Sequence, residues 1–366
     1  MRYVPLSFIQ EGMILGKTLY GSMGEVLLRK GTPILKLYVR RMEKLGYTGV
    51  YIQDELSQDI EVQDVINEDL RMQTIKTVKN FMHLSTESSK GVQEAFSDIE
   101  NLIGSIIEDI SNNKDLIVNL IDLKVASNYT FYHSVNVSVL SIVMGVALNL
   151  PPKDLYYLGL ASLLHDIGKI FTPKEILDKP GTLTKEEFEI IQQHAQNGYT
   201  YIKEKFTTHA KTYVGILQHH ERFDGTGYPE GKKGKDISLF GRIIAITDVY
   251  DALTSDRTYR KGVLPSEGME YIMGAGGTLF DPDLVKVFVS KIAPYPVGTC
   301  VQLSNGLVGI VAENNFSYFL RPKVKIIRNN NDYVEPYIMD LKESNLNVTI
   351  VGVADVLKQD ITLNAV

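Results

Sequence analysis

The sequence predicts a multi-domain α+β protein whose all-helical core is flanked by two small modules. Helical spacing of apolar residues dominates 115–292, turn and strand signals fill the first 55 residues, and short apolar runs separated by polar residues follow Pro294. We therefore expect a small α+β module over 1–60, a helical connector over 61–114, the helical core over 115–292 and a β-rich module over 293–366.

The two flanking modules show strand signals at specific places. A glycine-containing turn separates Lys17–Tyr20 from Glu25–Leu28, which is typical of a hairpin. A short helix is predicted over Leu37–Leu45 with Gly46 as its stop, followed by a strand at Gly49–Ile52. The C-terminal module is predicted to hold strands at Val301–Leu303, Val308–Val311 and Val324–Ile327.

The connector is predicted to form two helices, the second with a continuous apolar seam. The seam residues are alternately four and three positions apart, which is a heptad pattern. They are Val92, Phe96, Ile99, Ile103, Ile106 and Ile110. This helix, over 92–110, could pack on the next domain or pair with a second subunit to form a homodimer.

Composition is that of an ordinary globular protein and excludes several classes. The net charge of −6 argues against DNA or RNA as a partner. The single cysteine, Cys300, excludes a disulfide framework and a cysteine-based metal site. The first residues lack the apolar core of a signal peptide, and Val135–Leu150 is too short and too polar for a membrane span. We expect a cytoplasmic protein in which that stretch is a buried helix.

A histidine and an aspartate stand side by side at the end of an apolar helical stretch. His165 and Asp166 could both reach a metal there, since side chains converge where a helix ends. Gly168 is expected to let the chain turn sharply, and Lys169 would place a positive charge where a phosphate sits. Imidazole and carboxylate ligands suit transition metals such as iron, manganese and zinc.

Two further patterns supply candidate ligands. His219 and His220 precede a loop that ends in Gly-Tyr-Pro, in which two glycines and a proline demand a fixed conformation. Asp248 and Asp251 lie three residues apart, so they share one face of an otherwise apolar helix. A carboxylate there needs a partner, and a metal is one. The histidines without a motif, His83 and His209, are expected to be ordinary surface or core residues.

The order of these residues resembles the HD-GYP branch of the HD phosphohydrolase superfamily. The similarity covers about residues 115–292 and implies an all-helical catalytic domain. The matching segments are Tyr129–Ser134, His165–Lys169, His219–Pro229 and Thr247–Arg257, with Tyr259 and Arg260. The resemblance also implies two divalent transition-metal ions, with iron or manganese favoured and zinc, nickel or cobalt as further candidates.

The ligands implied by this resemblance fall into two sets that share one carboxylate. One ion would be bound by His133, His165 and Asp248, and the other by His194, His219 and His220, with Asp166 as the bridge. Some members hold a third metal through a glutamate four residues before the first histidine. Tyr129 occupies that position here, so two metals are expected.

The resemblance implies a cyclic di-GMP phosphodiesterase that forms linear pGpG, with GMP as a further product. A hydroxide shared by the ions would attack phosphorus while positive charge stabilises the phosphoryl oxygens. The predicted catalytic residues are Asp166 and Lys169, and the predicted substrate contacts are Lys169, Tyr228, Arg257 and Arg260. The arginines could instead be exposed helix residues, and Tyr228 a loop anchor. Asp224 and Asp251 are expected to orient the ligands.

Two other functions stay open at this point. One is a phosphodiesterase for another cyclic dinucleotide, because the loop at 219–229 argues only against deoxynucleotide triphosphates and alarmones. The other is a non-catalytic, nucleotide-sensing adaptor, which the extra modules at both ends would suit. The presence of every predicted ligand favours an enzyme.

Overall fold

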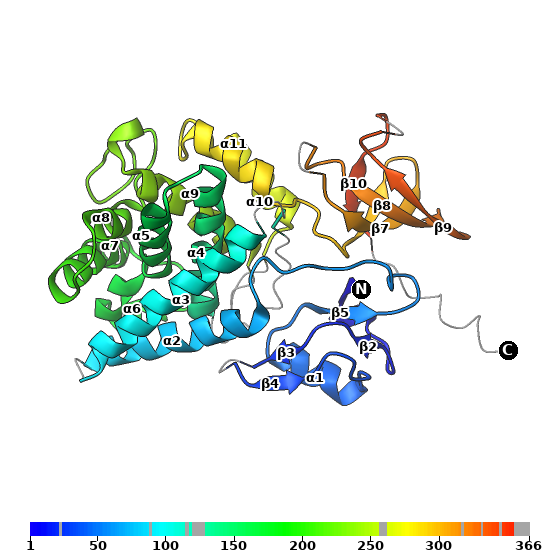
Figure 1. Ribbon diagram of the computed structural model, residues 1–366, viewed down its shortest axis with the longest axis horizontal. Coiled ribbons are helices and arrows are strands. Elements are labelled where there is room, and N and C mark those ends of the chain that lie inside the picture. Colours follow the sequence, from blue (N-terminus) through cyan, green and yellow to red (C-terminus); the bar gives the residue numbers. More distant parts are fainter. Residues whose placement is uncertain are drawn as a thin grey trace. The chain divides into compact units, whose positions relative to one another are not determined.

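The chain forms two compact units, a β-rich unit and a helical unit (Figure 1). The β-rich unit takes residues 1–64, 117–127 and 292–366, and the helical unit takes 65–116 and 128–291. The computed structural model describes residues 1–21, 24–87, 90–113, 117–118, 129–255, 262–315, 318–330, 332–343 and 346–354.

The N-terminal part of the β-rich unit follows the sequence prediction closely. Strands β1 (Arg2–Pro5), β5 (Gly49–Gln53) and β2 (Ile14–Leu15) form a sheet in the order β1-β5-β2. The predicted hairpin is confirmed as β3 (Leu19–Tyr20) paired with β4 (Val26–Leu28), and the predicted helix as α1 (Lys36–Lys44). Gly46, with φ of 86°, ends that helix in the left-handed conformation that glycine adopts without strain. A 3-10 turn, η1, spans Leu6–Phe8.

The C-terminal part is a five-stranded antiparallel sheet in the order β10-β6-β7-β8-β9. The three predicted strands are confirmed as β6 (Cys300–Leu303), β7 (Leu307–Glu313) and β8 (Lys323–Asn329). The two edge strands, β9 (Asp332–Asp340) and β10 (Ile350–Val353), escaped prediction. Strand β9 is largely exposed and contains Pro336, which only an edge strand tolerates, so its sequence lacks a strong strand pattern.

The two ends of the chain share one apolar core within the β-rich unit. Tyr51 and Ile60 pack in one cluster with Ile310 and Ile327. The backbone N–H of Tyr3 donates to the carbonyl of Gly298 at 3.0 Å. Segments far apart in sequence therefore complete each other's hydrophobic surface.

The helical unit contains the predicted all-helical core together with the connector helices. Its α-helices are α2 (Glu68–Glu87), α3 (Val92–Asn112), α4 (Tyr129–Ala147), α5 (Pro152–Leu163), α6 (Lys174–Leu177), α7 (Lys185–Lys205), α8 (Ala210–Gln218), α9 (Leu239–Thr254), α10 (Pro265–Gly274) and α11 (Pro282–Lys291). Among the described residues of this unit, the 3-10 helix η3 (Ile167–Phe171) lies between α5 and α6, and η4 (Gly234–Asp236) lies between α8 and α9. Local capping defines the start of α7, where Thr184 and Glu187 form a reciprocal capping box.

Helix α4 is the apolar stretch of the sequence, and it lies in the core as expected. Its window Thr130–Ala147 is long and apolar enough to cross a membrane, but 78% of it is buried inside the protein. Two of the polar residues that interrupt the stretch, Ser138 and Ser141, are hydrogen-bonded in the interior.

The apolar seam of α3 is used within the chain. Helix α3 packs against α2, α4 and α5, and Ile99, Ile103 and Ile106 are fully buried. Phe96 stacks on Phe206 with ring centroids 4.1 Å apart. Of the two alternatives for the 92–110 helix, packing within the subunit is the one observed. The seam is thus largely covered within the subunit, and a homodimer through the 92–110 helix stays a prediction.

Candidate metal centre

Helices from across the helical unit bring all seven predicted ligands together. His133 lies on α4, His194 on α7 and Asp248 on α9, while the two adjacent pairs follow the ends of α5 and α8. The ligand atoms form three overlapping groups, each within 4.8 Å: His194, His219 and His220; His133, His165 and Asp166; and His165, His219 and Asp248. The positions predicted from motif order thus lie in one cluster.

The Asp166 carboxylate lies between two groups of imidazoles. Its Oδ2 atom is 3.4 Å from Nε2 of His165 and 4.0 Å from Nε2 of His133. Its Oδ1 atom is 3.4 Å from Nε2 of His194. Asp166 is only 2% exposed. Each oxygen therefore faces a different part of the cluster, which suits a carboxylate shared by two cations.

Three of the histidines are oriented by the backbone of their own segment. Nδ1 of His165 donates to Ser162 O at 2.8 Å, Nδ1 of His194 to Ile191 O at 2.7 Å, and Nδ1 of His219 to Ile216 O at 2.6 Å. A carbonyl oxygen can only accept, so Nδ1 carries the proton in each case. The Nε2 lone pairs are then left to point into the cluster.

This arrangement fits a divalent cation better than it fits a cluster held by hydrogen bonds alone. Nε2 of His194 and Nε2 of His219 are 3.2 Å apart, so two lone pairs face each other when both rings are neutral. The buried Nε2 of His165 has no hydrogen-bond partner among the described residues. A buried polar atom without a partner is costly, and two bound cations, one beside His165 and one beside His194 and His219, would satisfy these nitrogens.

Electrostatics leave the imidazoles of His219 and His220 neutral. Burial lowers the pKa of His219 well below its usual value, and neighbouring imidazoles lower it further. Burial also lowers the pKa of His220 to about 3, against the opposing effect of Asp248. Neutral imidazole is the form that binds a metal, so these side chains need lose no proton at neutral pH.

His133 differs from His194 and His219 in both its hydrogen-bond partner and the direction of its pKa shift. Its Nδ1 atom is 2.7 Å from Oδ2 of Asp251, and its Nε2 atom is 3.1 Å from Oδ1 of Asp248. Burial lowers the pKa of His133, but its hydrogen bonds to Asp248 and Asp251 outweigh burial and raise it to about 9. Asp251 therefore contacts a candidate ligand, as expected from the sequence.

Lys169 lies at the more exposed side of the cluster. Its Nζ atom is 2.5 Å from Oδ2 of Asp166, and its side chain is 31% exposed. Burial raises the pKa of Asp166, but Lys169 and the histidines outweigh burial and hold that pKa well below its usual value. The predicted cation beside the ligands is thus present.

Gly168 is required for a reason other than the predicted sharp turn. Its φ is not among the positive values, so no left-handed turn occurs there. A Cβ atom at this position would lie 1.9 Å from the carbonyl oxygen of His194. Gly168 therefore lets η3 approach α7 closely, which brings His165 and Asp166 to His194.

The loop after His220 is held against the cluster by buried polar contacts. The Tyr228 ring stacks on His220 with centroids 4.8 Å apart, and Glu221 accepts hydrogen bonds from the backbone N–H groups of Glu230 and Lys232. A Cβ atom on Gly227 would lie 2.3 Å from the backbone nitrogen of Arg222, so only glycine fits. Anchoring by Tyr228 is observed, and base stacking by Tyr228 stays a prediction.

Some predicted residues lie elsewhere or outside the described chain. Arg257 and Arg260 fall in 256–261 and lie outside the described residues, as does the side chain of Tyr129. Asp224 accepts from the N–H and hydroxyl of Thr226, so it shapes the loop and does not orient a ligand. His209, as expected, has an ordinary role: it caps α8 and stacks on Tyr157.

Sequence reasoning missed the polar residues that support the cluster. Gln218 is 2% exposed and links Glu230 to the backbone N–H of Ser238. Asn136 is 1% exposed and donates to Asp251. Asn136 interrupts an apolar helical stretch, and that interruption was the available signal.

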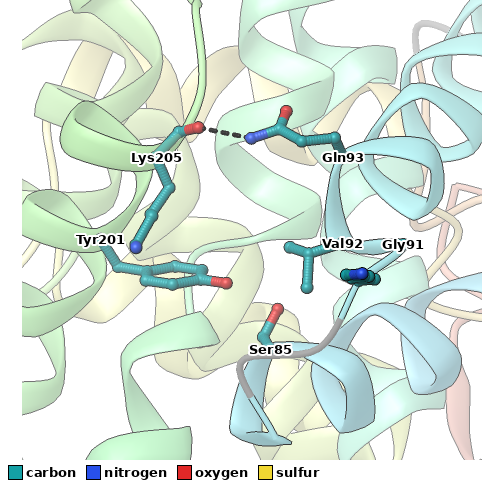
Figure 2. Close-up of a pocket in the computed structure, with 7 residues that line it drawn as sticks. Ser85, Gly91, Val92, Gln93, Tyr201 and Lys205 are labelled. Atoms are coloured by element: carbon teal, nitrogen blue, oxygen red, sulfur yellow. Dashed lines mark hydrogen bonds between the residues drawn. The ribbon is translucent and has the colours of Figure 1, made fainter.

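A separate hollow in the helical unit lacks metal ligands. This cavity of about 260 Å³ is lined by Ser85, Lys90, Gly91, Val92, Gln93, Tyr201 and Lys205 (Figure 2). The Gln93 amide closes one side by donating to the carbonyl of Lys205 at 2.8 Å. None of the described lining residues carries a carboxylate or an imidazole, so the histidine and aspartate cluster remains the candidate metal centre.

Comparisons with known proteins agree with the geometry. The HD domain model matches residues 114–284. A cyclic di-GMP phosphodiesterase of Pseudomonas aeruginosa is 40% identical over 226 residues, which are 62% of this chain and 54% of that protein. A 3′3′-cGAMP-specific phosphodiesterase of Vibrio cholerae is 40% identical over 163 residues, which are 44% of this chain and 37% of that protein.

A solved structure of an HDG"Y"P protein from Bdellovibrio bacteriovorus aligns with a TM-score of 0.47 at 18% identity, covering 78% of this chain and 97% of that one. The chain spans between 31% and 62% of the length of eight curated relatives that it matches. The match over 114–284 contains every one of the seven clustered ligands. The resemblance predicted from the sequence is confirmed for this segment: residues 114–284 match the HD domain family.

Proposed function

We propose that this chain is a metal-dependent phosphodiesterase for cyclic dinucleotides and that its substrate is cyclic di-GMP. The observation that carries the proposal is the Asp166 carboxylate, whose two oxygens face different buried imidazoles. Two divalent transition-metal ions, with iron or manganese favoured, would supply a nucleophilic water at neutral pH and neutralise phosphoryl charge.

The chain's own residues would hold these ions and align the phosphodiester. His133, His165 and Asp248 would bind one ion, His194, His219 and His220 the other, and Asp166 would contact both. Lys169 is the described protein cation beside Asp166, and its partly exposed ammonium could turn to a phosphoryl oxygen. Tyr228, Arg257 and Arg260 remain the predicted substrate contacts.

The choice of cyclic di-GMP rests on similarity. The relative in Pseudomonas aeruginosa carries that substrate in its name and matches 226 residues, against 163 for the Vibrio cholerae relative of the same identity. We propose linear pGpG as the product, with GMP formed if the second ester is also cleaved. The Vibrio cholerae relative, named for 3′3′-cGAMP, makes that dinucleotide the second candidate.

The test is product chromatography with the purified full chain. Metal-free protein is reconstituted anaerobically with ferrous or manganous ions and incubated with cyclic di-GMP or 3′3′-cGAMP in parallel. We expect pGpG from cyclic di-GMP, a slower reaction of 3′3′-cGAMP, and loss of both in Asp166→Ala. Asp154→Ala is the matched control, because it also removes an aspartate paired with a lysine, at 2.7 Å from Lys211, away from the cluster.

Three results would contradict the proposal. Full turnover in a folded Asp166→Ala variant would reject the site. Faster turnover of 3′3′-cGAMP would reject the substrate. A wild-type chain that binds cations but hydrolyses neither dinucleotide would support the non-catalytic adaptor.

A further inference from the structure

A line of buried side chains connects helix α2 to His133. Nη1 of Arg71 donates to Oδ1 of Asn136 at 2.7 Å, and Nδ2 of Asn136 donates to Oδ1 of Asp251 at 3.0 Å. Oδ2 of Asp251 is 2.7 Å from Nδ1 of His133. The four side chains are between 1% and 8% exposed. They come from three helices, α2, α4 and α9, so they form a tertiary connection.

The donor and acceptor types in this line allow one orientation of each group. The Arg71 guanidinium can only donate, so the Asn136 oxygen must face it and the Asn136 amide nitrogen must face Asp251. An ionised Asp251 can only accept, so Nδ1 of His133 must carry a proton. That leaves Nε2 of His133 as the atom that faces Asp248 and Asp166.

The first residue of this line lies outside the segment that matches the HD domain. The matched segment begins at residue 114, whereas Arg71 is in the first turn of α2 (Glu68–Glu87). Helix α2 also packs against α4, which carries His133, and against η3, which follows Asp166. The connector helix therefore contacts the segments that carry ligands of the cluster.

We infer that Arg71 is a positioning residue for the metal centre, so that helix α2 is a working part of a site otherwise built by the HD domain. Arg71 fixes the Asn136 amide, Asn136 and His133 fix the Asp251 carboxylate, and Asp251 fixes the tautomer and the ring direction of His133. The inference rests on the proposed role of His133 as a metal ligand.

The expected effect follows from the behaviour of groups that support metal-bound histidines. Loss of such a partner typically weakens metal binding by roughly 10- to 100-fold. Arg71 is two hydrogen bonds removed from Asp251's contact with the histidine, so we expect the lower end, about tenfold. The effect should fall on one of the two ions, because His194 and His219 are oriented by backbone carbonyls instead.

The experiment is a titration of the metal-free full chain with Mn²⁺, followed by calorimetry. Arg71→Met is compared with Arg71→Lys. The lysine side chain is also a cation that only donates hydrogen bonds, so this variant should keep most of the metal affinity. Lys76→Met is the matched control, since it removes an exposed cation from the same helix. Circular dichroism and melting temperature check the fold. If Arg71→Met does not fold, Asn136→Asp replaces it, because it keeps the size of the side chain but removes the donor to Asp251.

Weaker binding of one Mn²⁺ ion, with the other unchanged and with rescue by Arg71→Lys, is the expected result. Unchanged binding of both ions in a folded Arg71→Met or Asn136→Asp variant would overturn the inference, and so would equal loss of both ions. Because the experiment measures metal affinity and not turnover, failure of this inference can be distinguished from failure of the proposed function. A wild-type chain that binds two ions and shows the Arg71 effect, but hydrolyses no dinucleotide, would reject only the enzymatic proposal.

Discussion

His133 and the other oriented histidines of the cluster lie in two regions that are built differently. In three of them, His165, His194 and His219, Nδ1 donates a hydrogen bond to the carbonyl oxygen three residues earlier. The orientation of each ring is therefore set within one turn of the chain. His133 donates to a carboxylate on another helix, and that carboxylate is held by Asn136. One region is fixed by local backbone geometry, and the other depends on tertiary contacts between α2, α4 and α9.

The difference indicates where the site can be changed. A backbone carbonyl cannot be removed by substitution, so the three backbone-held histidines respond only to loss of the ring itself or to movement of the chain. The His133 region has side chains at every step, and each one can be replaced. We therefore expect substitutions in the two regions to change metal affinity in different ways.

The largest effect is expected from His165→Ala, because His165 lies near both Asp166 and Asp248. Removing this ring should reduce turnover of cyclic di-GMP to background and lower the bound metal below the wild-type content. Metal analysis and product chromatography measure both. The control is His209→Ala, whose ring caps α8 outside the cluster. Wild-type turnover by a folded His165→Ala protein would refute the ligand assignment.

The next effect is expected from Asp251→Asn, which breaks the His133 region alone. The amide gives His133 a weaker acceptor and places a second amide beside Asn136, so Mn²⁺ affinity at one site should fall by roughly 10- to 100-fold. Ser255→Ala serves as the comparison, because it removes the 3.1 Å hydrogen bond from Ser255 to Asp251 and leaves the Asp251 carboxylate in place. Equal weakening of both sites by Asp251→Asn would show that the two regions are not separable.

A smaller effect is expected from Gly168→Ala, which moves the backbone of the other region. The added methyl group would meet the carbonyl of His194, and such overpacking costs about 1–3 kcal/mol of unfolding free energy. Chemical denaturation measures this loss of unfolding free energy. Weaker metal binding by His194, His219 and His220 should accompany it. By contrast, Gly104→Ala, at an exposed helical site with open space, should stabilise the chain by about 0.5–1 kcal/mol. A neutral Gly168→Ala variant would contradict the close approach of η3 and α7.

The smallest effect is expected from Lys185→Ala. Lys185 and Glu189 are 85% and 60% exposed and 4.0 Å apart, and such surface pairs contribute little. Melting temperature, metal affinity and turnover should all match the wild-type values. A marked change in metal affinity would mean that effects in the other variants are not local to the cluster.

The sequence predicted which residues cluster, in part because two pairs of candidate ligands are adjacent and in part through the family resemblance, which added His133 and His194. His165-Asp166 and His219-His220 are pairs whose types and order indicate a metal site, and the structure brings them together. The support of His133 could not be predicted, since Arg71 and Asn136 are 65 residues apart and Asn136 and Asp251 are 115 residues apart. A single asparagine in an apolar helix signals a buried partner but does not say which one.

The flanking regions show the same limit. The α3 seam was visible as a heptad pattern, yet the pattern is the same whether its partner is another helix of the chain or a second subunit. Strand β9 was not visible because an exposed edge strand needs no alternation of apolar residues.

The shared core of the β-rich unit also constrains the order in which parts of the chain can fold during synthesis. Asp59 pairs with Lys325 across 266 residues, and Tyr51 and Ile60 are covered by Ile310 and Ile327. During synthesis the N-terminal sheet emerges long before its covering strands exist, so its apolar face must wait in water while the whole helical unit is made. The nascent chain therefore exposes a hydrophobic surface for a long time. Its yield in the cell should depend on chaperones that bind that surface until the last strands have been synthesised.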